Sequence, residues 1–395
     1  ASNTAVGRAA LNANTTAANN TAVGYFALVA NTTGDRNVAV GGLALDANTV
    51  GVRNVAIGYQ ALTADTQGSR AVAIGHNALS VQNFTSATDS FNTAVGHEAG
   101  AAVTTGVKNT IIGGLAGDAI TTGERNVYLG YTTGTSATDV SFNVGLGAES
   151  LYTNVNGSRN VAVGNGALFA MNPASDTDTY NVAVGYDAGV AVTTGVQNTI
   201  VGGLAGDAIT TGSSNIAVGY QALTTDTKGS RSVAVGFSAL RFQANTSAVE
   251  TYNVAVGHAA GEAVTTGLQN TIIGGLSGDA ITTGSNNTTL GYAALSENTT
   301  ASNNTAVGHR ALIVTTTGTQ NTAVGANAGF ALTTGSNNTA FGFEALKNED
   351  AHGNNTAIGT QALFAQNAGA DAYNTAVGYQ AGAAVTTGVQ NTFIG

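Results

Sequence analysis

The chain has 395 residues, of which 9% are charged, 54 are Gly, one is Pro and none is Cys or Trp, and its formal net charge is −10. The acidic balance argues against a nucleic-acid partner, which needs a basic surface to neutralise phosphates, and the missing Cys excludes disulfides and thiolate metal sites. No apolar run approaches the roughly 20 residues of a membrane span, so we expect no membrane span in this chain.

A short unit that begins Asn-Thr/Val-Ala-Val/Ile-Gly repeats along the whole chain. The units start at residues 3, 20, 37, 54, 71, 92, 109, 126, 143, 160, 181, 198, 215, 232, 253, 270, 287, 304, 321, 338, 355, 374 and 391. The spacing is 17 residues, except that it is 21 after 71, 160 and 232 and 19 after 355. We therefore predict that residues 1–395 form a single repeat domain, and we number each unit from its Asn as position 1.

The alternation at positions 2 to 4 indicates a strand, and one unit per coil predicts an all-β, parallel β-solenoid of about 22–23 coils. At about 4.8 Å per coil the rod would be roughly 105 Å long. We expect position 4 to stack in the core, position 3 to face outward, Gly at positions 5 and 15 to mark turns, and Asn at position 1 to form a ladder. The predicted core ladder comprises Val6, Val23, Val40, Ile57, Gly7, Gly24, Gly41, Gly58, Asn20, Asn37 and Asn54.

Position 9 is Leu or Gly, and position 12 changes with it. Leu at position 9 accompanies a polar residue at position 12, as with Leu28 and Asn31, whereas Gly accompanies an aliphatic one, as with Gly100 and Val103. We predict that the two side chains fill one core space from different sides, because a vacant Leu site would leave a costly cavity. The unit that starts at residue 126, with Gly134, does not follow this rule.

Four coils are lengthened by insertions, within 80–91, 169–180, 241–252 and 364–373. Insertions in solenoids protrude on one side, where binding often occurs, so these segments are candidate recognition loops. Their aromatic residues are the candidate contact residues: Phe84, Phe91, Phe169, Tyr180, Phe242, Tyr252, Phe364 and Tyr373. The alternative is that each terminal aromatic residue holds its own loop onto the shaft.

Four of the five histidines, His76, His97, His258 and His309, occupy position 6, which elsewhere holds Tyr or Phe. They are therefore predicted members of an aromatic stack, in which adjacent coils would bring His76 and His97 within about 5 Å of each other. No acidic residue recurs beside them, and no phosphate-binding or catalytic motif occurs. We expect no enzymatic activity, no catalytic residue, no metal site and no cofactor.

Residues 231–239 read R-S-V-A-V-G-F-S-A, and residues 303–308 read N-N-T-A-V-G. These segments resemble the YadA-type head repeat of trimeric autotransporter adhesins, whose signature is N-S-V-A-I-G-x-x-S, and the resemblance covers the whole chain. Similar repeats also resemble the shafts of phage tail fibres and secreted fibre proteins. The resemblance implies a left-handed parallel β-roll in a homotrimer, and the longer unit of this chain implies a longer outer loop at positions 10 to 17.

The strip of small apolar residues at position 3, if exposed, independently favours a homotrimer, although Ala is also an ordinary surface residue. We predict a structural and adhesive extracellular fibre at a cell or virion surface, a rigid spacer whose loops contact a host-cell, matrix or glycan surface. The alternatives are a phage tail fibre or tailspike that binds or processes surface glycans, and an ice-binding solenoid with Thr-Thr-Gly runs. The uncapped ends predict a piece of a longer fibre or a head-to-tail filament.

Overall fold

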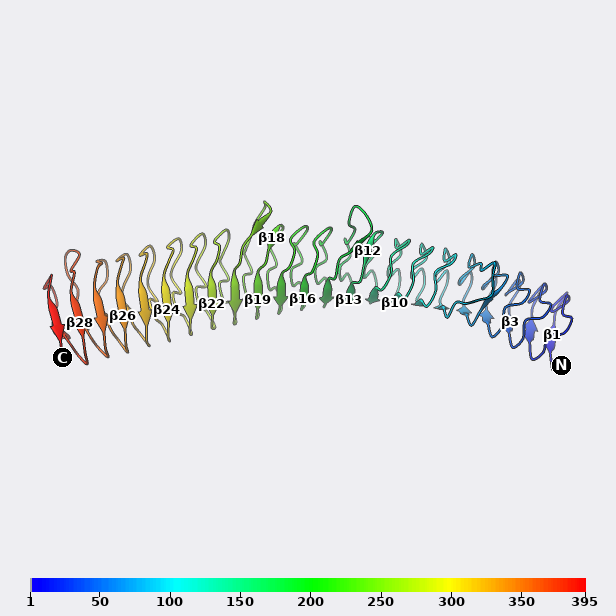
Figure 1. Ribbon diagram of the computed structural model, residues 1–395, viewed down its shortest axis with the longest axis horizontal. Coiled ribbons are helices and arrows are strands. Elements are labelled where there is room, and N and C mark those ends of the chain that lie inside the picture. The colour runs from blue at the N-terminus through cyan, green and yellow to red at the C-terminus, as the bar shows by residue number, and fades with distance from the viewer. Residues whose placement is uncertain (1) are drawn as a thin grey trace. The chain divides into compact units, whose positions relative to one another are not determined.

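A computed structural model describes residues 2–395, which form strands and turns and no helix. It distinguishes two compact units, the residues up to Gln197 and the residues from Asn198 to Gly395, and the boundary falls between two ordinary coils. Each unit is a parallel β-solenoid in which every coil contributes one strand of three residues to a ladder (Figure 1). Together they hold 23 ladder strands, which confirms the predicted all-β solenoid. The hand of the solenoid stays a prediction.

The ladder strands of the first unit are β1 (Thr4–Val6), β2 (Thr21–Val23), β3 (Val38–Val40), β4 (Val55–Ile57), β6 (Val72–Ile74), β8 (Thr93–Val95), β9 (Thr110–Ile112), β10 (Val127–Leu129), β11 (Val144–Leu146), β13 (Val161–Val163) and β15 (Val182–Val184). Those of the second unit are β16 (Thr199–Val201), β17 (Ile216–Val218), β19 (Val233–Val235), β21 (Val254–Val256), β22 (Thr271–Ile273), β23 (Thr288–Leu290), β24 (Thr305–Val307), β25 (Thr322–Val324), β26 (Thr339–Phe341), β27 (Thr356–Ile358), β28 (Thr375–Val377) and β29 (Thr392–Ile394).

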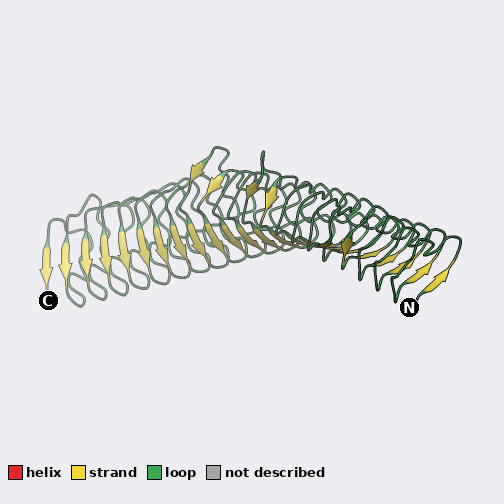
Figure 2. Cartoon of the chain, turned by 45° about the vertical axis from the view of Figure 1, so that its right-hand side comes forward, coloured by secondary structure: helices red, strands yellow, loops and turns green. Residues whose placement is uncertain are grey.

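Three further parallel pairs lie at the insertions: β5 (Gly68–Ser69) with β7 (Thr88–Asp89), β12 (Gly157–Ser158) with β14 (Thr177–Asp178), and β18 (Gly229–Ser230) with β20 (Val249–Glu250). Within each unit, consecutive ladder strands pair in register, so that equal positions of successive coils lie side by side. Ala22 thus pairs with Ala39, and Ala39 with Ala56. The strands line one wall of the coils and turns make up the rest (Figure 2).

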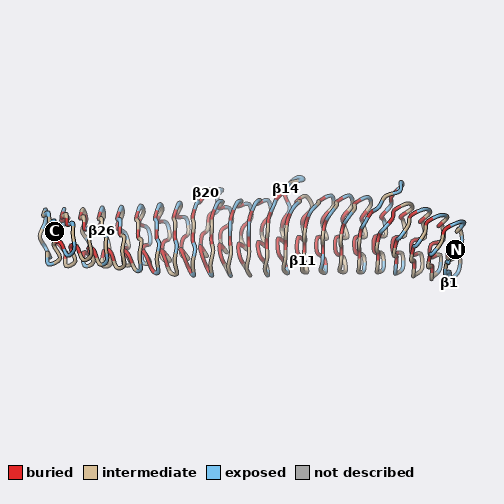
Figure 3. Tube along the Cα trace, turned by 60° about the horizontal axis from the view of Figure 1, so that its bottom comes forward, coloured by how far each residue is buried: buried red, intermediate tan, exposed pale blue. Residues whose placement is uncertain are grey.

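Position 3, rather than position 4, faces the core. Ala39 is fully buried between the half-buried Val38 and Val40, and its equivalents in other strands repeat this pattern (Figure 3). The predicted orientation of the strand was therefore wrong, and four residues of the predicted core ladder, namely Val6, Val23, Val40 and Ile57, lie on its outer face. Ala is the residue that fits inside because position 3 shares its space with the side chain at position 9.

The core space is shared by positions 3, 9 and 12, which confirms and extends the predicted exchange. A Cβ atom on Gly117 would lie 2.8 Å from Ile120 Cδ1, so the aliphatic residue at position 12 fills the space that Gly leaves at position 9. A Cβ atom on Gly100 would lie 3.0 Å from Cδ1 of Ile111, a position 3 residue of the next coil. A large residue at one of the three positions therefore requires a small one at another.

Tyr128 explains the unit that departs from the rule. This residue stands at position 3 and is fully buried. A Cβ atom on Gly134 would lie 2.7 Å from the Tyr128 ring, and one on Gly145 would lie 3.1 Å from it. The two glycines, at position 9 of the same coil and position 3 of the next, therefore make the room that the ring occupies.

The predicted Asn ladder at position 1 is confirmed, and its main bonds run from side chain to backbone. The Oδ1 atom of Asn20 accepts from the backbone N–H of Asn37 at 2.7 Å, and Nδ2 of Asn37 donates to the carbonyl of Gly51 at 2.8 Å. Gly51 is position 15 of the coil that Asn37 begins. Each buried Asn therefore ties the end of its coil to its start and also binds the next coil, which satisfies backbone groups that water cannot reach.

The corrected strand orientation predicts opposite sensitivities for neighbouring residues. We expect Ala39→Val to lower the free energy of unfolding by about 1–3 kcal/mol, because the inner face has no room for two methyl groups. Val40→Thr, on the outer face, is expected to change it by no more than about 0.5 kcal/mol. Urea denaturation measures both variants, and a larger loss from Val40→Thr than from Ala39→Val would contradict the orientation.

Candidate functional site

Position 17 closes each coil, and the terminal aromatic residues of the extended coils occupy it. Arg36 and Arg125 at this position have φ near +60° and +57°, and Phe91 and Tyr180 take the same left-handed conformation with φ of 49° and 53°. Tyr252 and Tyr373 do so as well. These four predicted contact residues therefore belong to the edge of the stacked coils and not to the tips of the loops.

Three of the four extended coils share one arrangement of an Arg, an acid and an aromatic ring. The Arg closes the preceding coil, pairs with a carboxylate at the base of the insertion, and lies over the ring two residues further on. Arg159 Nε is 2.8 Å from Asp178 Oδ2, and its Cζ is 5.8 Å from the centre of the Tyr180 ring. The equivalents are Arg70 with Asp89 (3.0 Å) and Phe91 (5.4 Å), and Arg231 with Glu250 (3.0 Å) and Tyr252 (5.7 Å).

The fourth extended coil replaces the Arg with Asn354. Its Nδ2 atom donates to Asp371 Oδ2 at 3.0 Å, and the backbone N–H of Gly353 donates to Asp371 Oδ1 at 2.8 Å. The acid again lies two residues before the terminal aromatic residue, Tyr373. The common element is thus the acid that fixes the base of the loop, while about half of each terminal ring stays exposed, as the 51% exposure of Tyr180 illustrates.

The remaining predicted aromatic residues do not lie at the loop tips. Phe84 is 6% exposed and anchors its loop from below, so its predicted role as a contact residue is wrong. Phe169 stacks on Tyr152 of the preceding coil with ring centres 4.9 Å apart, and Lys347 Nζ lies 5.4 Å from the Phe364 ring. Phe242 remains exposed, with Arg241 over its ring. The exposed stretches 85–87, 174–176, 246–248 and 369–371 carry small and polar residues instead (Figure 3).

Two buried aspartates, which we did not single out from the sequence, hold the starts of two insertions. Asp65 Oδ1 accepts the N–H groups of Gly68 at 2.8 Å and Phe84 at 3.2 Å, and its Oδ2 accepts Nε2 of Gln82 at 2.7 Å. Asp226 makes the equivalent bonds to Gly229, Asn245 and Gln243. The signal in the sequence is an acid at position 12 before an extended coil, followed by Gln at position 12 within it.

The same Gln residues explain the two coils that lack Asn at position 1. Ala71 and Ser232 begin extended coils, in which the insertion takes the place of the position 15 carbonyl that this Asn would bind. Gln82 Oε1 instead accepts Nδ2 of Asn92 at 2.8 Å, and Gln243 Oε1 accepts Nδ2 of Asn253 at 2.9 Å. The ladder therefore continues past each insertion through the Gln side chain.

Asp65 gives the first anchor a predicted dependence on pH. Burial raises the pKa of Asp65, against the hydrogen bonds from Gln82, Gly68 and Phe84, which lower it. The folded chain therefore holds this proton more tightly than the unfolded chain, and the carboxylate lowers stability as pH rises from about 4 through its folded pKa. We expect wild type to gain stability relative to Asp65→Asn between about pH 7 and about pH 4.5. Urea unfolding of both proteins measures this, and a constant difference contradicts it.

A shallow depression of about 320 Å³ lies at the foot of the third insertion. It is lined by Ser213, Ser214, Ser230, Arg231, Ala248, Val249 and Glu250. The backbone N–H of Ser213 donates to Ser230 Oγ at 3.0 Å, and Arg231 pairs with Glu250 as described above. Hydroxyl groups beside an ion pair suit a small polar contact group rather than an apolar ligand.

The histidines lie in the predicted aromatic stack. The rings of His76 and His97 are 5.2 Å apart and nearly parallel, at 7°, and Tyr59 stacks on His76 at 5.7 Å. The expectation that no acid accompanies them is wrong, because Glu98 Oε1 lies 3.9 Å from His97 Nε2. His76, His97 and Glu98 thus bring possible metal-ligand atoms within 4.8 Å of one another at a largely exposed edge.

The outer face of the ladder strands is apolar and partly exposed. The exposed residues at position 4 are Val6, Ile57 and Leu129 in the first unit, and Val256, Ile273, Leu290, Phe341, Ile358, Val377 and Ile394 in the second. Exposed aromatic residues at position 6 follow them in the chain: Tyr25, Tyr59, Tyr131, Tyr186, Tyr220, Phe237, Tyr292, Phe343 and Tyr379. Because position 3 is buried, the apolar strip predicted there is absent from the surface, and the argument for an interface passes to position 4.

No protein-family model matches the chain, and no curated protein matches it. The functional argument therefore rests on the surfaces described above. Among residues 2–395, no helix has the length and apolar character to cross a membrane.

The threonines at position 13 serve the stacking of coils. Thr32 Oγ1 donates to the carbonyl of Thr49 at 3.0 Å, Thr49 Oγ1 to that of Thr66 at 3.0 Å, and Thr104 Oγ1 to that of Thr121 at 3.1 Å. These hydroxyls are engaged with the next coil, so the Thr-Thr-Gly runs, which suggested an ice-binding alternative, have a structural explanation.

Proposed function

We propose that this protein is a structural and adhesive module of an extracellular fibre, and that copies of it associate as a homotrimer through the outer face of the ladder strands. The observation that carries the proposal is the exposed aliphatic row at position 4, which recurs in both units. A soluble protein rarely leaves so regular an apolar strip in contact with water, and such strips mark interaction surfaces.

A second and third copy of this chain are the occupants that fit the row best. Its apolar groups recur once per coil, so a partner must present apolar groups at the same spacing to cover them all. Another copy has that spacing by construction, and a closed assembly of identical chains covers the strip on every copy. The resemblance to YadA-type head repeats supports the same stoichiometry.

The adhesive part of the proposal rests on the insertions. Each coil binds its neighbours through its Asn ladder and its shared core, which makes the stack a rigid support with four regularly anchored loops. Their half-exposed terminal rings and small polar tips are suited to contact with a host-cell, matrix or glycan surface. The same parts would serve the shaft of a phage tail fibre, at a virion surface.

Charged substitutions on the outer strand face test the association. We expect Ile57→Lys combined with Leu290→Lys to lower the mass in solution to that of one chain, because desolvating the two ammonium groups opposes assembly. Asn303→Lys is the matched control, since position 17 carries Lys or Arg in other coils, and it should leave the mass unchanged. Far-UV circular dichroism checks the fold, and an unchanged mass in the double variant would argue against this face.

Shortening a loop tests adhesion separately. Deleting residues 246–249 reduces the extended coil to the common length of 17 residues and removes the loop tip. We expect weaker attachment of the protein to the surface that it recognises, with unchanged assembly. Attachment that survives the shortening of all four extended coils would remove the loops from the proposal.

A further inference from the structure

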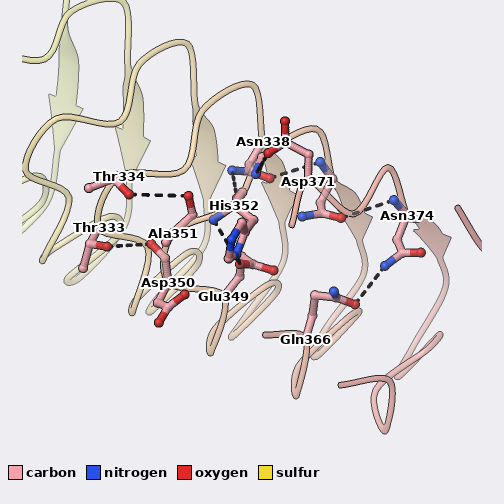
Figure 4. Close-up of polar contacts among 12 residues, drawn as sticks. Thr333, Thr334, Asn338, Glu349, Asp350, Ala351, His352, Gln366, Asp371 and Asn374 are labelled. Carbon is pink, nitrogen blue, oxygen red and sulfur yellow. Dashed lines mark hydrogen bonds and ion pairs between the residues drawn. The ribbon is translucent and has the colours of Figure 1, made fainter. Parts of the chain in front are cut away.

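The coil that begins at Asn338 carries an unusual cluster of ionisable side chains. Glu349, Asp350 and His352 stand at positions 12, 13 and 15, and positions 13 and 15 are most often Thr and Gly in the other coils. One potential ligand atom from each of the three residues lies within 4.8 Å of the others (Figure 4).

Two atoms of this cluster are buried without a hydrogen bond. Glu349 is fully buried and its Oε2 atom has no hydrogen-bond partner, and the same holds for the buried Nδ1 atom of His352. Nδ1 lies 3.4 Å from Glu349 Oε1, close enough for an ion pair but without hydrogen-bond geometry. Burial also raises the pKa of Glu349. Buried polar atoms without partners are costly, so these two call for a ligand.

Glu349 does not reproduce the acid–Gln bond of the loop anchors described above. It stands at position 12 before an extended coil, like Asp65, and Gln366 stands where Gln82 stands in the first extended coil. Nε2 of Gln366 nevertheless makes no hydrogen bond, whereas its Oε1 accepts from Asn374 at 2.9 Å. The Glu side chain associates instead with His352, whose backbone N–H donates to Oε1 at 3.2 Å.

The preceding coil holds the backbone of the cluster in place. The carbonyl of Asp350 accepts from Thr333 Oγ1 at 2.7 Å, that of Ala351 from Thr334 Oγ1 at 3.4 Å, and that of His352 from Asn338 Nδ2 at 3.1 Å (Figure 4). The side chains thus project from a fixed stretch of chain, which is the condition for a preorganised ligand set.

We propose that Glu349, Asp350 and His352 bind one divalent metal ion of the zinc class. Bonds of about 2.0–2.2 Å in tetrahedral geometry place neighbouring ligand atoms about 3.3–3.5 Å apart, and Nδ1 of His352 lies 3.4 Å from Oε1 of Glu349. One imidazole and two carboxylates suit zinc, whereas calcium requires six or more oxygen ligands. Asp350 and His352 are half-buried, which leaves room for water as the fourth ligand.

Isothermal titration of ZnCl₂ into the full chain, after treatment with EDTA and dialysis, tests the site. We expect wild type to bind zinc, and His352→Ala and Asp350→Asn each to weaken this binding by at least about tenfold. Asp350→Asn keeps the shape of a half-buried side chain, so it separates loss of a ligand from loss of the fold, which circular dichroism monitors. CaCl₂ at the same concentrations should not compete.

The exposed cluster of His76, His97 and Glu98 provides the matched control. The double variant His76→Ala/His97→Ala is expected to retain one zinc ion and its thermal stabilisation by zinc. The proposal is overturned if wild type binds no zinc, if His352→Ala and Asp350→Asn bind it as wild type does, or if the binding disappears in the double variant.

Discussion

Gly113→Ala is expected to destabilise the first unit severely, whereas Gly114→Ala, one residue further on, is not. Gly113 stands at position 5 with φ of +138°, and a Cβ atom there would lie 2.2 Å from the carbonyl oxygen of Gly130 in the next coil. Neither backbone can move, because each is held by the ladder, so we expect a loss of roughly 3 kcal/mol or more in the free energy of unfolding.

Gly114 is the control that the chain itself offers. Its φ is not positive, and a Cβ atom would meet only the side chain of Tyr131 at 3.7 Å, an ordinary contact. Gly114→Ala should therefore be neutral or stabilise by about 0.4–1 kcal/mol, since Ala restricts the unfolded chain. Thermal or urea unfolding compares the two variants, and similar losses from both would show that the close approach of the coils is not as described.

Tyr128→Ala is expected to lower the free energy of unfolding by about 3–5 kcal/mol, the cost of emptying a buried aromatic site. The ring fills the room left by Gly134 and Gly145, and no neighbouring side chain replaces it. Gly134→Leu alone should also destabilise, because the new side chain would collide with the ring 2.7 Å away.

The two changes are expected to compensate each other in one protein. Tyr128→Ala/Gly134→Leu restores the Ala and Leu of the common coil, and Leu tolerates the left-handed conformation at position 9, as Leu151 does in the next coil with φ of 52°. The double variant should therefore be more stable than either single variant, by a coupling of about 0.5–3 kcal/mol. Additive losses would contradict the shared core space.

The repeat made the fold predictable, and the strand orientation was the part that failed. Three residues are too few for alternation to tell the inner face from the outer one when both are apolar. The decisive signal lay in covariation within the chain: position 3 enlarges to Ile111, Ile200 and Ile272 in coils whose position 9 is Gly. Side chains that exchange volume must share a space, which places position 3 in the core.

The backbone at positions 7, 9 and 17 could not be predicted. Gln60, Leu62 and Arg70 adopt φ between +54° and +60°, a region that L-residues seldom enter and that costs on the order of 1 kcal/mol. Such residues carry no sequence signal for it, and only the stacked coils impose it. The cluster around Glu349 was missed because it is formed within one coil, whereas the comparison of equal positions across coils finds only what recurs.

Static light scattering of the unmodified protein tests the central claim, that this solenoid assembles through its outer strand face. One chain has a mass of 38.9 kDa. We predict a mass three times that of one chain, stable on dilution, because apolar association along many coils has a low dissociation constant. A mass of one chain at every concentration, with the solenoid fold intact by circular dichroism, would contradict it.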